Sequence, residues 1–261
     1  MQSLKIAATG MAAQQMRVDV ISNNLANMST TAYNARRAEF ADLHYQQLTR
    51  PGTINASDGT IVPTGVQIGL GVRPSAVTVD HQQGSLSATN GELDIAIDGD
   101  GYLEVALPSG ASAYTRDGAL KLSADGLIVT SDGYAVVPEI TVPDDTRSIS
   151  INPDGELYAY FDGEVDAELL GQFTLTDFSN QKGLEAIGGN LFLETEASGP
   201  PLVAAPGEDG LGTVRQGYLE DSSVDSVREI TDLIQAQRGY ELNAKVISAV
   251  DQMLSATTQI R

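Results

Sequence analysis

The first part of the 261-residue chain repeats apolar side chains with a helical period. Residues 4 to 28 contain no proline, and nearly every third or fourth position in this stretch is apolar. The pattern predicts an amphipathic helix of about 25 residues, roughly 38 Å long at 1.5 Å per residue. The stripe has the a/d spacing of a coiled coil. Its members are Leu4, Ala7, Met11, Gln14, Val18, Ile21, Leu25 and Met28.

A second proline-free stretch predicts a long helix over residues 226 to 261, and Ser226 and Glu229 have the spacing of a capping box. Two apolar stripes can be drawn on it. The first contains Ile230, Leu233, Tyr240, Ala244, Ile247 and Leu254, and the second contains Leu242, Val246, Ala249, Met253 and Ile260. One partner helix cannot cover both, so the pattern predicts an apolar face for neighbours from other copies. The alternative is a helical pair packed on the chain's own globular domain.

Between the two ends the hydrophobic period changes to two. Short runs rich in β-branched and aromatic residues predict strands at 93–97, 102–107, 127–130, 134–137, 148–151 and 156–161. Asp-Gly pairs begin at 98, 100, 117, 125, 132, 154 and 162, and such pairs between alternating runs are a hairpin signal. The middle is therefore predicted as antiparallel sheet packed against sheet, or as an irregular barrel.

Glycine and proline interrupt residues 50 to 75 so often that we expect little continuous strand or helix there. The predicted fold class is α+β: terminal helices paired in a coiled-coil-like helical domain, an inserted antiparallel β-rich domain and an extended connecting segment. The expected division is residues 1–30 with 223–261 for the helices, 31–75 for the connector and 76–222 for the β-rich domain.

The charge of the chain argues against nucleic acids and anionic membranes as partners. The formal net charge is -20, and residues 51 to 200 hold twenty-three acidic against five basic side chains. Such a surface repels phosphates and anionic headgroups, so we expect no nucleic-acid partner and no insertion into a membrane. There is no apolar run of about eighteen residues to span a bilayer and no secretory signal pattern, which predicts export by another route. The chain also has no cysteine, which excludes disulfides and thiol chemistry.

Candidate catalytic groups are few. His44 and His81 are the only histidines, and neither lies in a triad or metal-ligand motif. The sequence starting at Asp98 begins like a calcium loop, but its fifth and sixth positions are Tyr102 and Leu103, so a turn is the better interpretation. With no tryptophan and 5% aromatic residues, a glycosidase site lacks its usual aromatic platforms. We therefore expect no enzyme activity and no cofactor. A secreted acidic β-rich carbohydrate-active enzyme or adhesin is the alternative from another class.

Both ends of the chain carry specific motifs. They are Asp-Val-Ile-Ser-Asn-Asn-Leu-Ala-Asn at 19–27, Thr-Thr-Ala-Tyr at 30–33, Arg-Ala-Glu-Phe-Ala-Asp-Leu at 37–43 and Leu-Ile-Gln-Ala-Gln-Arg-Gly-Tyr-Glu-Leu-Asn-Ala-Lys at 233–245. These motifs resemble those of the rod, hook and hook-associated proteins of the bacterial flagellum. Segments 44–52, 65–74, 94–101 and 112–118 are similar to those of rod-type members. The resemblance is weakest between about 142 and 170.

Two departures from this family pattern affect the local structure. The chain has Ala32-Tyr33-Asn34 where the family commonly has Gly-Phe-Lys or Gly-Tyr-Lys, which puts a turn with positive φ there in doubt. Gly239 replaces a common alanine inside the last helix, at a cost of about 1 kcal/mol of helix propensity. Close packing against a neighbouring helix could offset that cost.

The resemblance implies a subunit of the distal rod, self-assembled into a hollow, rigid helical drive shaft that transmits torque and conducts exported subunits. A proximal rod or hook subunit is the alternative. The implied location is the periplasm-spanning rod of the basal body. Implied partners are further copies in a helical tube, proximal rod proteins, hook protein, the peptidoglycan-level and outer-membrane bushing rings, and the flagellar type III export apparatus.

The resemblance and the helical stripes together select candidate assembly residues. The helical set expected to pack between subunits is Leu4, Met11, Val18, Ile21, Asn23, Asn24, Leu25, Asn27, Ile230, Leu233, Ile234, Gln237, Arg238, Tyr240, Asn243, Ile247 and Leu254. The set expected in the rod-type connector is Tyr45, Arg50, Pro51, Gly52, Pro63, Gly69, Gly71, Arg73 and Pro74.

Overall fold

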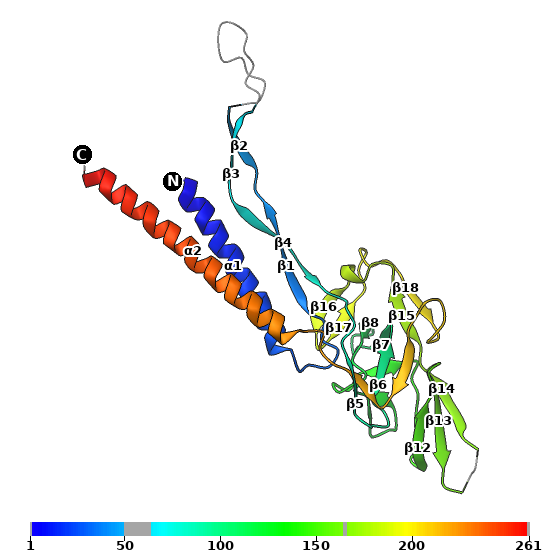
Figure 1. Ribbon diagram of the computed structural model, residues 1–261. Coiled ribbons are helices and arrows are strands. Elements are labelled where there is room, and N and C mark those ends of the chain that lie inside the picture. The colour runs from blue at the N-terminus through cyan, green and yellow to red at the C-terminus, as the bar shows by residue number, and fades with distance from the viewer. Residues whose placement is uncertain (1, 50–63, 164–165, 260–261) are drawn as a thin grey trace. The chain divides into compact units, whose positions relative to one another are not determined.

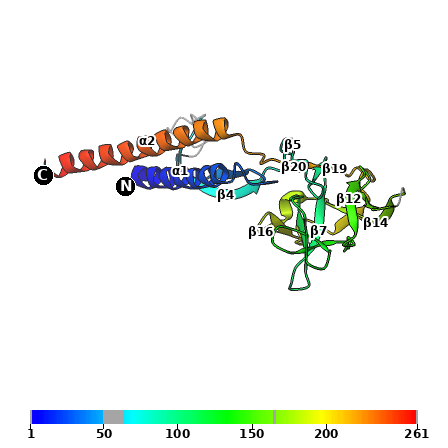
Figure 2. The same ribbon diagram turned by 90° about the horizontal axis from the view of Figure 1, so that it is seen from below.

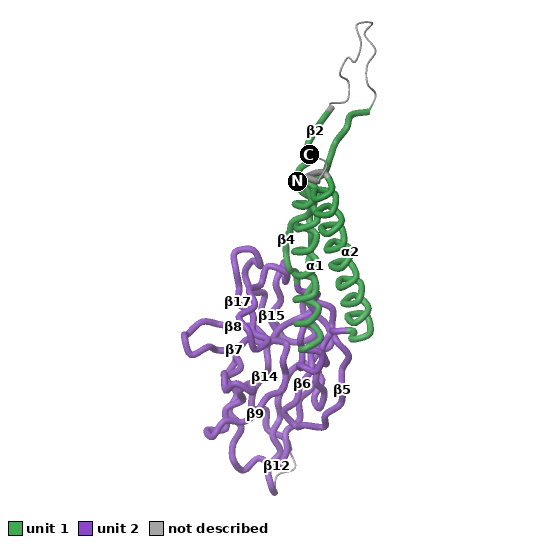
Figure 3. The backbone as a smooth tube through the Cα atoms, turned by 90° about the vertical axis from the view of Figure 1, so that its left-hand side faces the viewer, with its two compact units in different colours: residues 1–26, 36–78, 225–261 green, residues 27–35, 79–224 purple. Residues whose placement is uncertain are grey.

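The computed structural model describes residues 2–49, 64–163 and 166–259, and it divides the chain into two compact units (Figures 1 and 3). The helical unit consists of Met1–Ala26, Arg36–Thr78 and Asp225–Arg261. The β unit consists of Asn27–Ala35 and Val79–Val224. The predicted α+β class, with helices at both ends and an antiparallel β-rich region between them, is confirmed.

Two long helices and four strands build the helical unit. The helices α1 (Gln2–Ala26) and α2 (Ser226–Gln259) lie side by side and run in opposite directions (Figures 1 and 2). The strands form two-stranded ribbons, β1 with β4 and β2 with β3. Their bounds are Arg36–Asp42 for β1, Tyr45–Thr49 for β2, Val66–Gly69 for β3 and Val72–Val79 for β4. The coiled-coil-like pairing of the helices stays a prediction.

The expectation of little strand between residues 50 and 75 was wrong for β3 and for the start of β4. The glycine-rich segment forms a strand because β2 supplies backbone partners in antiparallel register, with Tyr45 opposite Gly69. Between β3 and β4, Gly71 has φ +118, and a Cβ there would collide with the side chain of Thr9 on α1. The glycines therefore permit close approach as well as turns.

Among its described residues the β unit has sixteen further strands, and all strand pairings between them are antiparallel. The largest sheet follows the order β16-β17-β8-β7-β11-β10-β9, with β15 also on β7 and β18 on β15. A three-stranded sheet β12-β13-β14 and the pairs β19-β6 and β20-β5 complete the unit.

The strand bounds are β5 Leu86–Ala88, β6 Ile95–Asp98, β7 Tyr102–Ala106, β8 Ser112–Thr115, β9 Lys121–Leu122, β10 Ile128–Val129, β11 Ala135–Val137, β12 Thr146–Ile151, β13 Glu156–Phe161, β14 Glu168–Gln172, β15 Leu175–Phe178, β16 Glu185–Gly188, β17 Leu191–Leu193, β18 Pro201–Ala204, β19 Thr213–Gln216 and β20 Tyr218–Glu220. A 3₁₀ turn, η1, covers Gln181–Gly183. Each of the six predicted strand runs overlaps one of these strands, namely β6, β7, β10, β11, β12 and β13.

One apolar core joins the sheets of the β unit. Leu103 and Leu175 from the large sheet, Leu157 from the three-stranded sheet and Phe173 are completely buried in it. Burial of this apolar area is the main force that holds the short strands together. A smaller aromatic cluster consists of Tyr102, Tyr114, Phe178 and Phe192. Leu184, which follows η1, packs against it.

The Asp-Gly pairs do not all act as predicted. Those that begin at 125, 132, 154 and 162 do join antiparallel neighbours, as expected of hairpin turns. The pairs at 98, 100 and 117 do not, because β6 pairs with the distant β19, and β7 and β8 pair with each other. In the segment between β6 and β7, Gly99 has φ +121 and Gly101 has φ +135, so both adopt a conformation that favours glycine.

A buried ion pair lies beside this glycine segment. Arg116 Nε is 3.0 Å from Glu220 Oε2, and the two side chains are 8% and 2% exposed. The remaining guanidinium nitrogens donate to the carbonyl oxygens of Gly101 at 2.9 Å and Gly99 at 3.0 Å. Glu220 also accepts a hydrogen bond from the backbone N–H of Gly84. This Arg116 clamp joins four segments of the β unit, and the chain order alone does not reveal it.

The segment 27–35 crosses into the β unit, where it makes the turn that the sequence left in doubt. Ala32 has φ 53, and its N–H donates to the Glu220 carbonyl oxygen at 2.8 Å. Asn190 Nδ2 donates to the carbonyl oxygen of Thr31, and the Ser223 N–H donates to that of Tyr33. The doubt about a positive-φ turn was therefore misplaced: alanine adopts the left-handed conformation because these bonds fix the backbone around it.

Replacement of Ala32 with glycine tests this conformation. A left-handed alanine costs about 1–2 kcal/mol, and its removal should offset the lost buried methyl group and the greater entropy of the unfolded chain. We expect Ala32→Gly to change the free energy of unfolding by less than about 0.5 kcal/mol, and Ala35→Gly, whose φ is not positive, to lower it by about 1 kcal/mol. Urea unfolding measures both variants. Equal losses in the free energy of unfolding for the two variants would contradict backbone strain at Ala32.

Candidate assembly surface

The two long helices approach each other at small residues. A Cβ on Gly10 would lie 2.9 Å from Asn243 Nδ2, and a Cβ on Gly239 would lie 3.1 Å from Gln14 Cδ. Ala236, one turn before Gly239, is completely buried. Gly239 therefore gives up about 1 kcal/mol of helix propensity and permits close packing of α2 on α1 within the same chain.

Polar side chains tie the other end of the helix pair together. Arg17 on α1 forms an ion pair of 3.0 Å with Asp232 on α2. Asn24 is buried, and its Nδ2 donates to the Arg36 carbonyl oxygen at 2.8 Å and to Glu229 Oε1 at 3.1 Å. Its Oδ1 accepts from the Arg36 N–H at 2.9 Å. Asn24 therefore supports the start of β1 and the fold of its own chain.

The start of α2 differs from the predicted capping box. The cap is Asp225, whose Oδ1 accepts from the N–H groups of Val227 at 3.0 Å and Arg228 at 3.2 Å. Ser226 is the first helical residue. The Glu229 carboxylate accepts a hydrogen bond from Asn24 in place of the backbone N–H that a capping box would require. Burial raises the pKa of this carboxyl above its usual value. The capping-box assignment failed because an aspartate one residue earlier caps the helix equally well.

The described members of the second stripe of α2 remain exposed, and Ile260 lies outside the described residues. Its members Leu242 and Met253 are 62% and 61% exposed, and Val246 is 47% exposed. Of the first stripe, Leu233, Ala244 and Ile247 are half-buried, whereas Ile230, Tyr240 and Leu254 are exposed. Single exposed apolar side chains are ordinary on a protein surface, but a stripe of them along one helix marks an interaction site. We call Leu242, Val246, Ala249 and Met253 the outer stripe.

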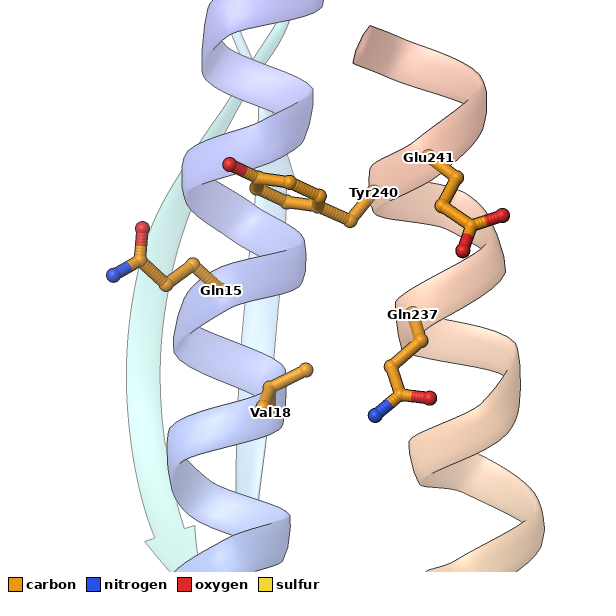
Figure 4. Close-up of a pocket in the computed structure, with 5 residues that line it drawn as sticks. All are labelled: Gln15, Val18, Gln237, Tyr240 and Glu241. Carbon is orange, nitrogen blue, oxygen red and sulfur yellow. The ribbon is translucent and has the colours of Figure 1, made fainter.

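A shallow groove of about 390 Å³ runs between the two helices (Figure 4). Gln15 and Val18 line it from α1, and Gln237, Tyr240 and Glu241 line it from α2. The ring of Tyr240 extends toward α1, above Val18 in this view. The groove offers one aromatic and one aliphatic side chain with a polar rim, a composition typical of protein contact surfaces.

The β2–β3 ribbon presents a further apolar surface. Tyr45 and Leu48 on β2 are 57% and 61% exposed, and Val66 on β3 is 52% exposed. The Tyr45 ring packs over Gly69, where a Cβ would be 3.5 Å from its Cε1. A two-stranded ribbon is marginally stable alone in water, so a partner on these side chains would stabilise it.

The structure places the other predicted assembly residues as follows. On α1, Ile21 is buried, Leu4, Met11, Val18 and Leu25 are half-buried and Asn23 is exposed, and Asn27 is half-buried in the turn that follows. On α2, Asn243 is half-buried and Ile234, Gln237 and Arg238 are exposed. In the connector, Gly69 and Gly71 are half-buried and Arg73 and Pro74 are exposed on β4. Arg50, Pro51, Gly52 and Pro63 lie outside the described residues.

Two titratable side chains of the β unit, Tyr102 and His81, lie at its aromatic cluster and have a structural role. The Tyr102 hydroxyl is 2.9 Å from His81 Nδ1, in the aromatic cluster. Burial raises the pKa of Tyr102 to about 12 and lowers the pKa of His81. Within residues 2–49, 64–163 and 166–259, no cluster of histidine or carboxylate side chains could hold a metal ion. In the same ranges, neither helix is apolar enough over a sufficient length to cross a membrane.

A long helix pair with an exposed apolar stripe, joined to an inserted acidic β unit, defines a class of structural protein with a candidate contact surface on its helices. Family models agree with this class and cover three parts of the chain. The model described as flagella basal body rod protein matches residues 4–33. The D1 domain of flagellar hook protein FlgE/F/G matches residues 96–159, and the C-terminal region of flagellar basal body rod FlgEFG protein matches residues 215–260.

Curated relatives identify the particular family. The chain is 53% identical to flagellar basal-body rod protein FlgG of Caulobacter vibrioides over 100% of both chains. It is 48% identical to FlgG of Agrobacterium fabrum over 99% of each chain, and 43% identical to FlgG of Borreliella burgdorferi over 100% of this chain and 99% of that one. The chain belongs to the FlgG family of flagellar basal-body rod proteins.

Family membership confirms the structural, motility-related role in the flagellar basal body that the terminal motifs predicted. It favours a structural protein over the carbohydrate-active enzyme or adhesin.

Proposed function

We propose that the chain is a subunit of the distal rod that assembles with further copies into a hollow, rigid helical drive shaft. The outer stripe of α2 carries this proposal, because α1 leaves Leu242, Val246 and Met253 exposed. In a tube, helices of neighbouring subunits cover such a stripe and form the inner layer around an export channel. Burial of one Leu or Val side chain contributes about 1.5–3 kcal/mol, so the stripe is a strong source of association energy.

In this proposal the two units have different roles because their charges differ. The helical unit carries ten basic and nine acidic side chains, a net charge of +1, whereas the β unit carries five basic and twenty-six acidic ones, a net charge of -21. Nearly neutral units can stack without repulsion. The acidic unit faces outward toward the bushing rings at the peptidoglycan and the outer membrane, where its hydrated charge resists adhesion during rotation.

The connector gives the proposal its rod-specific element. Exposed Tyr45, Leu48 and Val66 on the β2–β3 ribbon would lie on neighbouring subunits and stiffen the tube. The proximal rod proteins and the hook protein are the proposed axial neighbours, and the flagellar export apparatus is the proposed route to the periplasm. In this proposal residues 1–30 and 223–261 form the helical inner layer, residues 31–75 form the connector, and residues 76–222 form the outer β-rich domain.

Electron microscopy of the polymerised, purified chain tests the proposal. We expect hollow, straight rods, and we expect deletion of residues 44–63 to permit assembly but to yield tubes that bend more, because the ribbon contacts are lost. The measurement is the persistence length of tubes of each kind. A curved polymer of the unaltered chain would favour the hook alternative, and deletion tubes as straight as the wild type would refute the role of the connector.

A further inference from the structure

The three-stranded sheet β12-β13-β14 has one buried and one exposed face. Along β13, Leu157 and Ala159 are completely buried, and Ile151 on β12 pairs with Leu157 on the same side. Successive side chains of a strand point to opposite faces, so Tyr158 and Tyr160 lie on the other side. The exposed side is therefore not a continuation of the core.

Strand register gathers large side chains on the exposed side. Tyr158 is directly opposite Leu169 on β14, and Tyr160 is opposite Ser148 on β12. Tyr160 is 40% exposed and Leu169 is 51% exposed. The Tyr158 hydroxyl donates to Glu156 Oε2 at 2.7 Å, which fixes that ring beside the strand. We call Tyr158, Tyr160 and Leu169 the tyrosine face.

The three-stranded sheet and its turns are predominantly acidic. The sheet and its turns, from residue 144 to residue 168, carry one basic side chain, Arg147, among the described residues. Over the same described residues there are seven carboxylates, six of them exposed and the other, Glu156, half-buried. They are Asp144, Asp145, Asp154, Glu156, Asp162, Asp166 and Glu168. An apolar, aromatic surface on a predominantly acidic sheet is complementary to an apolar surface ringed by lysine and arginine.

We propose that the tyrosine face, in contrast to the hydrated, charged remainder of the β unit, is a docking surface for a different protein, one whose contact surface has an apolar centre and a basic rim. A second copy of this chain is disfavoured because its β unit carries the same net charge of -21. Like charges across an interface suppress the wrong partner, whereas opposite charges also steer the right one. Nucleic acid and anionic lipid are disfavoured for the same reason.

The chemistry of the tyrosine face suits a protein partner. Tyrosine supplies a large, rigid contact area at low cost in side-chain entropy, and its hydroxyl remains available for hydrogen bonds. Such residues carry a disproportionate share of the binding energy in protein interfaces. Removal of the Tyr160 ring is therefore expected to weaken binding at least tenfold, and neutralisation of a carboxylate beside the tyrosine face is expected to lower the salt dependence of binding.

Photo-crosslinking in motile cells tests the proposal with the full chain. A p-benzoylphenylalanine group replaces Tyr160 in one strain and Val203 on β18 in a control strain, since Val203 is comparably exposed at 48%. We expect position 160 to crosslink to one heterologous protein through a peptide rich in lysine or arginine, and position 203 not to do so. Crosslinks to another copy of this chain, to glycan or to nothing would overturn the proposal.

Binding measurements then use a synthetic peptide with the crosslinked sequence as the probe. We expect Tyr160→Ser and Leu169→Ser each to raise the dissociation constant at least tenfold, Glu156→Gln to lower the salt dependence, and Val203→Ser to change nothing. Equal binding by all variants would refute the tyrosine face. Rod formation by Tyr160→Ser separates this outcome from the proposed function, because the docking surface can fail while assembly through the helices persists.

Discussion

Replacement of Leu242 and Val246 by aspartate is expected to hold the chain as a monomer at concentrations where the wild type forms rods. Both side chains are exposed on the outer stripe, so the substitutions leave the fold of the single chain intact. In the assembled state each would place a carboxylate in an apolar contact and forfeit about 1.5–3 kcal/mol of burial. We therefore expect the critical concentration for polymerisation to rise by a factor of at least about 100.

Sedimentation velocity measures the effect, and a second double variant provides its control. Ser248→Asp with Gln252→Asp adds the same two charges at the same spacing, at exposed positions in the same half of α2. We expect the control to polymerise like the wild type, with the same helix content by circular dichroism. Normal polymerisation by the Leu242 and Val246 variant would show that the outer stripe is not buried in the rod.

Disruption of the Arg116 clamp is expected to have the largest effect on folding. Arg116→Met leaves the Glu220 carboxylate, 2% exposed, without its cation, and it removes the donors to the Gly99 and Gly101 carbonyl oxygens. Loss of one partner of a buried ion pair typically costs about 3–5 kcal/mol. We expect a loss of this size in the free energy of unfolding of the β unit, measured by urea titration of the full chain.

Arg215→Met is the matched control, because Arg215 pairs with Asp98 at 3.2 Å but with side chains 53% and 43% exposed. An exposed pair contributes about 0–1 kcal/mol, so the same chemical change should cost little here. The double variant Arg116→Met with Glu220→Gln removes the unpaired charge and should recover part of the loss. Equal losses at Arg116 and Arg215 would refute the special role of the clamp.

Local pattern predicted some elements well and others poorly. The α1 helix was predicted within two residues at each end because its apolar repeat continues over 25 residues without a proline. The strands β2 and β3 were not predicted, since their hydrogen bonds cross from residues 45–49 to residues 66–69. No repeat within either segment encodes that pairing. The Arg116 clamp was not predicted for the same reason, because its two charged members are 104 residues apart in sequence.

The positive φ of Ala32 is a clearer case of tertiary control. The sequence argues against a left-handed residue at a non-glycine position. The bond from the Ala32 N–H to the Glu220 carbonyl oxygen, together with the bonds to Thr31 and Tyr33, holds that conformation. The partners are between 159 and 190 residues away along the chain, so no local sequence pattern could predict the turn.

The sequence by itself determined the family, the two long helices, the antiparallel β-rich middle and the concentration of negative charge there. These properties follow from motifs, short-range periodicity and composition, which are local along the chain. Only the tertiary structure decided that residues 36–78 belong with the helices and residues 27–35 with the β unit, which leaves net charges of +1 and -21. It also decided which stripe of α2 packs on α1 and which remains exposed. Such outcomes depend on contacts between residues far apart in sequence, where close packing and hydrogen bonding select one arrangement among many that the local pattern allows.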